Sequence, residues 1–155
     1  MTSTKWLNSL ELEAWKNLSL MNLQLNALLN KDLATSGLSF QDYLVLATLS
    51  DQPDGKRRIQ EIGHELGWEK SRTSHHISRM CERGFVSKEK CPSDKRGQIV
   101  ALTASGRKAA QLAAPGHVAK VRSLFIDVVT TKELQTIGEI ASKVLTRLEQ
   151  ETLDN

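Results

Sequence analysis

Polar side chains that can bind nucleic acid recur at helical spacing between Trp68 and Arg83. They lie three or four residues apart and therefore share one face of a predicted helix: Arg72, His75, His76, Arg79 and Arg83. The opposite face is apolar and can hold the helix on a core: Trp68, Ile77, Met80 and Cys81. Arginine can bind guanine O6 and N7 with two hydrogen bonds, and lysine or short hydroxyls can reach phosphates. We therefore predict a DNA-reading helix with these contact residues: Lys70, Ser71, Arg72, Ser74, His75 and Arg79.

The elements around this helix predict how it is presented. A shorter helix pattern covers residues 60–66, and Gly67 forms the turn between the two helices. Gly84 ends the second helix, and strands at residues 85–90 and 98–102 follow as a hairpin with its tip at residues 92–97. This order is typical of a winged helix-turn-helix.

The hairpin tip is a second predicted contact, made by Asp94, Lys95 and Arg96. An arginine there can enter the minor groove, where the potential is most negative. Asp94 is suited to orient Arg96 or to cap the turn, because its charge would be repelled by DNA.

Long helices flank the reader. The first is expected from Asn8 or Ser9 to about Leu33 and is apolar on more than one face, which indicates a second subunit as an additional partner. Helices are also expected to begin at Ser39, after Thr103 and at Thr130, with Pro115 kinking or dividing the penultimate one. We predict a mainly α fold with a small β-hairpin wing. Residues 37–103 would form the winged helix-turn-helix, and residues 1–36 and 104–155 a helical dimerisation region.

Charge is concentrated on the predicted reader. The chain has 155 residues and a net charge of +3. Residues 56–108 hold 13 Lys/Arg and 6 Asp/Glu, a local charge of +7, as expected for a module that binds a polyanion.

Other functional classes find no support in the sequence. No nucleophile–base–acid set, phosphate loop or metal cluster indicates an enzyme, a metal site or a cofactor. No apolar run approaches the length of a membrane span, and the N-terminus lacks a signal-peptide core, so we expect a cytoplasmic protein without a membrane partner.

Five pieces of sequence together resemble the MarR family of transcriptional regulators, over essentially the full chain. They are residues 37–39 (Gly-Leu-Ser), 70–75 (Lys-Ser-Arg-Thr-Ser-His), 83–86 (Arg-Gly-Phe-Val), 94–97 (Asp-Lys-Arg-Gly) and 102–106 (Leu-Thr-Ala-Ser-Gly). The resemblance implies a homodimer on double-stranded DNA with a pseudo-palindromic operator, usually a repressor released by a ligand or by oxidation. Two reading helices would enter major grooves about one turn apart, with Arg96 of each wing in a flanking minor groove.

The effector is the open part of this interpretation. The resemblance implies a pocket among the first, second and fifth helices, where Trp15, Tyr43 and His117 could receive a small aromatic or phenolic effector. Equally, Trp15 and Tyr43 could be core residues and His117 an ordinary capping residue. Cys91, flanked by lysines, offers a thiol-based redox alternative, and a sequence-neutral architectural DNA-binding protein is a further one.

Overall fold

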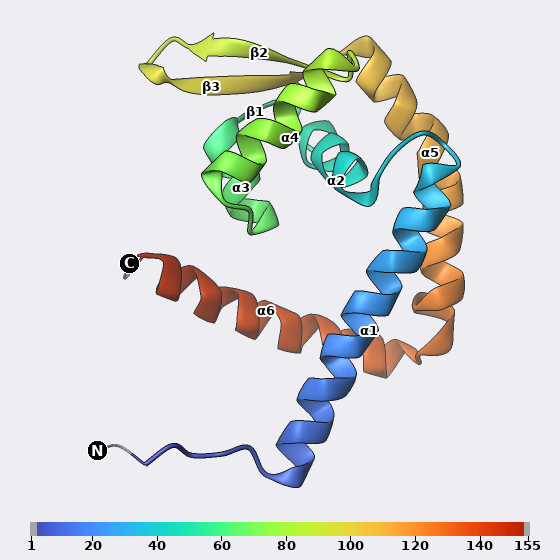
Figure 1. The fold of residues 1–155 in the computed structure, drawn as a ribbon. Helices are drawn as coiled ribbons and strands as arrows, with labels where there is room; N and C mark the ends of the chain where they lie inside the picture. Colours follow the sequence, from blue (N-terminus) through green and yellow to red (C-terminus); the bar gives the residue numbers. More distant parts are fainter. Residues whose placement is uncertain (1–2, 154–155) are drawn as a thin grey trace. The chain divides into compact units, whose positions relative to one another are not determined.

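The computed structural model describes residues 3–153, except for the side chains of residues 94–96. Its elements, labelled in Figure 1, are α1 (Ser9–Ala34), α2 (Phe40–Ser50), β1 (Lys56–Arg58), α3 (Ile59–Leu66), α4 (Lys70–Glu82), β2 (Val86–Cys91), β3 (Asp94–Leu102), α5 (Ala104–Leu124), the short 3-10 helix η1 (Ile126–Val128) and α6 (Thr131–Leu153). The predicted fold class, mainly α with a small β wing, is confirmed. The chain forms two compact units, Met1–His117 and Val118–Asn155. The predicted division at residues 37 and 103 separates a DNA-binding part from a dimerisation part, and it stays a prediction.

The predicted helix starts are confirmed by their caps. Asn8 with Glu11 and Ser39 with Asp42 form capping boxes at α1 and α2, and Thr130 and Glu133 exchange the same bonds before α6. Pro115 does not divide α5, which is continuous from Ala104 to Leu124. A proline removes only one backbone donor, so the turns on either side keep their own hydrogen bonds.

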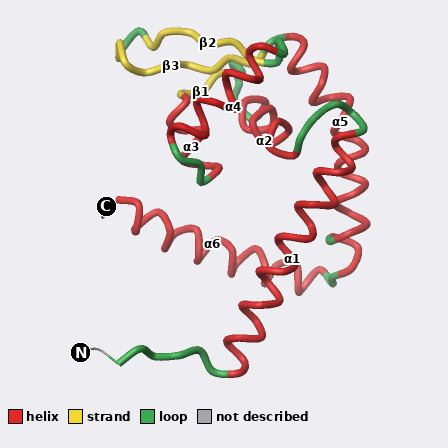
Figure 2. The backbone as a smooth tube through the Cα atoms, viewed as in Figure 1, coloured by secondary structure: helices red, strands yellow, loops and turns green. Residues whose placement is uncertain are grey.

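The sheet is antiparallel with strand order β1-β3-β2. Val100 of β3 lies between Arg57 of β1 and Lys88 of β2. The hairpin turn is tighter than predicted, because β3 already begins at Asp94 and leaves only Pro92 and Ser93 between the strands. Proline fixes the φ angle that such a turn needs, and a bulge after Lys90 accommodates the extra residues of β3. Figure 2 shows this two-stranded ribbon continuing beyond the short β1.

One hydrophobic core holds the reader together. It joins residues of α2, α3 and α4 to the base of the wing and to the ends of α1 and α5 that lie in the same unit: Leu33, Leu38, Val45, Leu46, Leu49, Ile62, Ile77, Met80, Val86, Val100 and Ala113. Ile77 and Met80 are fully buried, which fixes the apolar side of α4 and turns its other side outward.

The long C-terminal helix α6 contributes no residue to this core. In α6, none of the described residues is buried, although Ile140, Val144 and Leu148 are large and apolar. No helix in the described part of the chain is long and apolar enough to span a bilayer.

Candidate nucleic-acid interface

The α3–α4 turn depends on two glycines. Gly67 ends α3 with φ +65°, a left-handed conformation that glycine adopts without a side-chain penalty. Gly63 allows close packing of the two helices, because a Cβ there would lie 2.7 Å from the Thr73 hydroxyl oxygen. The turn therefore fixes the N-terminal end of α4 against α3.

The outward side of α4 carries most of the predicted contact residues. Lys70, Ser71, His75 and Arg79 are exposed, and Ser74 is half-buried at the edge of this side. Arg72 is exposed too, but its guanidinium lies 4.9 Å above the Trp68 ring, a cation–π contact on the flank of the helix. None of the six predicted residues is therefore buried in the core, and their contact with DNA stays a prediction.

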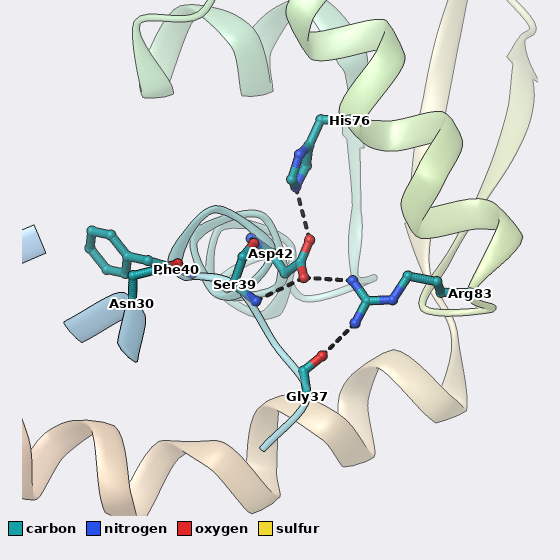
Figure 3. A network of polar contacts seen from close by, with 7 residues as sticks. All are labelled: Asn30, Gly37, Ser39, Phe40, Asp42, His76 and Arg83. Atoms are coloured by element: carbon teal, nitrogen blue, oxygen red, sulfur yellow. Dashed lines mark hydrogen bonds and ion pairs between the residues drawn. The ribbon is translucent and has the colours of Figure 1, made fainter. Parts of the chain in front are cut away.

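The prediction that His76 and Arg83 share this polar face is wrong. Both turn toward Asp42 at the start of α2 (Figure 3). Burial alone would raise the pKa of Asp42, but interactions with His76, the Ser39 backbone and Arg83 outweigh it and hold that pKa well below its usual range. The three side chains form a polar cluster in which Asp42 is buried, His76 is largely buried and Arg83 stays partly exposed.

The wing adds a basic face that the sequence analysis did not list among the contacts. Side chains alternate along β2, so Lys88 and Lys90 share a face. Lys88 donates a 2.7 Å hydrogen bond from Nζ to the Ser78 hydroxyl of α4, which places this face next to the reading helix. The strand alternation could have identified both lysines. The predicted tip contacts, Asp94, Lys95 and Arg96, lie outside the described side chains and remain predictions.

Ion pairs divide the basic residues of the reader into two groups. Lys56 pairs with Glu89, and Arg57 contacts Glu61 and Glu65 of α3. In contrast, Lys70, Arg79 and Lys90 have no acidic partner among the side chains that the structure describes. Their charges are therefore free to bind phosphate.

A hollow of 410 Å³ opens between α3, the first turns of α4 and β3. Lys70 and Ser74 border it, together with hydrogen-bonding side chains that the sequence analysis did not single out: Gln60, His64 and Gln98. Amide, imidazole and ammonium groups of this kind commonly hydrogen-bond phosphate and sugar oxygens. Ile59 and Trp68 also line the hollow, so it offers an apolar floor with polar groups at its border.

The three residues predicted to contact an effector are not all together. The rings of Tyr43 and His117 lie 4.4 Å apart, and Phe40 is 6.2 Å from His117. Trp15 is 62% exposed and stands 17 residues before Asp32, the acidic residue that acts on His117; this is about 25 Å along α1. Only Tyr43 and His117 therefore share a place within one chain.

Two ionisable groups at this place are perturbed by burial. Desolvation lowers the pKa of His117, against the opposing charge of Asp32, and burial raises the pKa of Tyr43. The imidazole is therefore neutral at pH 7, and its buried Nδ1 has no hydrogen-bond partner among the described residues. Cys91, the redox alternative, is only 5% exposed, and its sulfur lies 3.2 Å from the Ser93 hydroxyl.

Comparisons with known proteins agree with this geometry. The sequence model of the MarR family matches residues 36–97. AbsC from Streptomyces coelicolor, a MarR-family transcriptional regulator, is 34% identical, with a TM-score of 0.88 over 95% of this chain and 99% of that one. Sco3205 from the same organism, solved in complex with DNA, is 32% identical, with a TM-score of 0.87 over 94% of this chain and 91% of that one.

A more distant structure shares the fold alone. CouR from Rhodococcus jostii RHA1, bound to p-coumaroyl-CoA, is 22% identical, with a TM-score of 0.73 over 82% of this chain and 87% of that one. No curated protein sequence matches the chain. The identity with AbsC over nearly the whole of both chains decides the assignment: the chain belongs to the MarR family of DNA-binding transcriptional regulators.

Proposed function

We propose that the protein is a homodimeric repressor that binds a pseudo-palindromic operator and is released by a small aromatic effector. The observation that carries this proposal is the continuity of the outward side of α4 with the basic face of β2. The hydroxyl, imidazole and guanidinium groups on that side can distinguish base edges, whereas a sequence-neutral binder mainly needs positive charge. Sco3205, 32% identical over nearly the full chain, was solved with DNA.

Dimer formation is supported by large apolar side chains that face solvent in a single chain. In α1 and α6 they are Leu10, Trp15, Leu18, Leu23, Ile140, Val144, Leu145 and Leu148. Apolar surface on this scale marks an interaction site. A two-fold dimer would set two reading helices about 34–36 Å apart, one turn of DNA, with the wings over flanking minor grooves.

Effector binding is supported by the ring pair Tyr43–His117. A neutral imidazole with a free Nδ1 can hydrogen-bond a carboxylic acid or phenol, and the rings of Phe40 and Tyr43 can pack on an aromatic group. CouR, which has the same fold, binds p-coumaroyl-CoA. The redox alternative is less well supported, because a thiol sensor must be accessible to its oxidant and Cys91 is buried.

The test selects duplexes from a random library with the full-length protein and measures their affinity against random duplexes at one salt concentration. We expect a two-fold symmetric consensus and a preference of about 10³-fold or more. Sedimentation velocity should show a dimer bound to one duplex. Equal affinities would contradict the proposal and favour an architectural role.

The effector is tested with a panel of small phenolic acids added to the complex with the selected duplex. Release of DNA from the wild type but not from His117→Ala supports the assigned place. Equal release from both would place the effector elsewhere.

A further inference from the structure

We propose that Asp42 is a positioning residue for DNA binding: through His76 and Arg83 it fixes the orientation of α4, and neither of those basic side chains contacts DNA. This inference rests on the DNA-reading role proposed for α4. It assigns a function to Asp42, an acidic residue that is buried against the reading helix.

Both oxygens of the Asp42 carboxylate are occupied. Oδ1 lies 3.0 Å from Nε2 of His76, an ion-pair distance without hydrogen-bond geometry. Oδ2 accepts hydrogen bonds of 2.6 Å from Arg83 and 2.9 Å from the Ser39 backbone nitrogen. The side chain is almost fully buried, so solvent screens these contacts weakly. The carboxylate therefore joins α2 to α4 at two points.

The two points are well placed to control orientation. His76 and Arg83 are seven residues apart, two turns or about 10 Å along α4. Ile77 and Met80 hold the apolar side of α4 on the core, and two polar contacts on a neighbouring side add a restriction on its tilt and rotation.

The partner side chains are held on their other sides as well. The His76 ring packs 5.1 Å from the Trp68 ring, and the Arg83 guanidinium lies 4.7 Å above the Phe85 ring and donates to the Gly37 carbonyl. Figure 3 shows both side chains directed toward α2 and the preceding loop. Their hydrogen-bonding groups are therefore directed into the protein.

Small rotations of α4 would matter for reading. At a helix radius of about 5–6 Å, a rotation of about 20° displaces a side chain by about 2 Å. A hydrogen bond to a base edge tolerates only a few tenths of an ångström. His75 is next to the first anchored residue, His76, and Arg79 lies between the two, so the anchors set the positions of both.

The contact also reaches α1. Asp42 forms the capping box of α2 together with Ser39. The residue after Ser39, Phe40, donates a 2.9 Å hydrogen bond from its backbone nitrogen to the Asn30 side chain of α1. A displacement at the α1–α2 junction would therefore be passed to α4 through Asp42. The desolvation of a buried ion pair offsets most of its Coulombic attraction, so we assign this cluster a role in geometry rather than in stability.

The test compares variants of the full-length protein on the duplex selected above. Asp42→Asn and Arg83→Met each remove one side of the Asp42–Arg83 ion pair. Glu133→Gln is the matched control, because it changes the acidic residue of another capping box. Arg79→Met removes an equal charge from the outward side of α4. Affinity is measured over a range of salt concentrations, at a temperature where urea unfolding shows each variant to be folded.

We expect Asp42→Asn and Arg83→Met each to weaken binding about tenfold, with an unchanged salt dependence. The double variant should be no weaker than Asp42→Asn alone, because Asp42→Asn already removes the contact that Arg83→Met breaks. Glu133→Gln should bind like the wild type. Arg83 is partly exposed at the end of α4, so Arg83→Met keeps the test available if Asp42→Asn does not fold.

Two results would overturn the inference. Folded variants with wild-type affinity would show that the cluster does not position α4. A fall of about 1.8 in the salt slope of Arg83→Met, about 0.9 for each protomer of the dimer, would show that Arg83 itself binds a phosphate. Failure of the proposed function would instead appear in the wild type, as equal affinity for selected and random duplexes.

Discussion

Lys90 and Lys56 form a matched pair for testing which face of the wing binds DNA. Lys90 is exposed on the face that Lys88 joins to α4 and has no acidic partner among the described side chains. Lys56 lies on the other face of the same sheet and pairs with Glu89 at 3.0 Å. Lys90→Gln and Lys56→Gln therefore remove the same charge from opposite faces.

The expected magnitude follows from counterion release. Each phosphate contact contributes a slope of about 0.9 in a plot of log K against log salt, so losing one contact weakens binding about eightfold near 0.1 M salt. A dimer loses two contacts, which lowers the slope by about 1.8 and weakens binding about 60-fold. Lys56→Gln acts only at long range through a Debye length of about 10 Å, and its effect should stay below about twofold.

The assay is fluorescence anisotropy of a labelled operator duplex between about 50 and 250 mM salt. Urea unfolding of each variant confirms that the wing is intact. Equal losses from the two substitutions would show that net charge, rather than the α4-facing side of the wing, drives binding. An unchanged slope for Lys90→Gln would remove that lysine from the interface.

Three further predictions concern the reading helix, the dimer and the polar cluster. Arg79→Ala should cost the selected operator about 1–3 kcal/mol more than random DNA if Arg79 reads a base; competition binding measures the difference, and equal losses would indicate a phosphate contact. Leu148→Asp should convert the dimer to a monomer in sedimentation velocity, since it places a charge on the exposed apolar face of α6; a persistent dimer would exclude this face.

Acid should weaken the wild type more than Asp42→Asn. The folded-state pKa of Asp42 lies below its ordinary value of 3.8, so its contribution is complete above about pH 4 and declines as the pH falls further. Urea unfolding at about pH 2 to 5 should therefore give stability curves that converge on acidification. Parallel curves would show that the cluster does not hold Asp42 ionised.

Local patterns predicted the elements of the reader, because caps, glycine turns and helical spacing are properties of neighbouring residues. Asn8, Ser39, Thr103 and Thr130 all cap helices as expected. The roles of His76 and Arg83 could not be predicted this way. His76 and Arg83 recur at the same helical spacing as Arg79, so the pattern gives all three the same role. Their different role comes from contact with Asp42, which lies 34 positions before His76 in the sequence.

The prediction of the effector residues failed in part for the same reason, because the sequence does not show which distant residues lie close together. Tyr43 and His117 are brought together by the packing of α2 and α5, whereas Trp15 is carried away by the length of α1. The family resemblance and their residue types pointed to all three as able to contact a ligand, but only packing decides which of them lie together. The wing lysines show the converse, since the alternation of β2 already contained the information.

The position of α2 suggests how the proposed release of DNA could be energetically feasible. Its first turns carry Phe40 and Tyr43 beside His117 on one side and Asp42 against α4 on the other. Allosteric coupling between two ligands typically amounts to about 1–3 kcal/mol. One hydrogen bond to a charged group contributes a similar amount, about 1.5–3 kcal/mol. An effector at His117 that shifts the first turn of α2 enough to break one contact of Asp42 would therefore supply a coupling of the typical size.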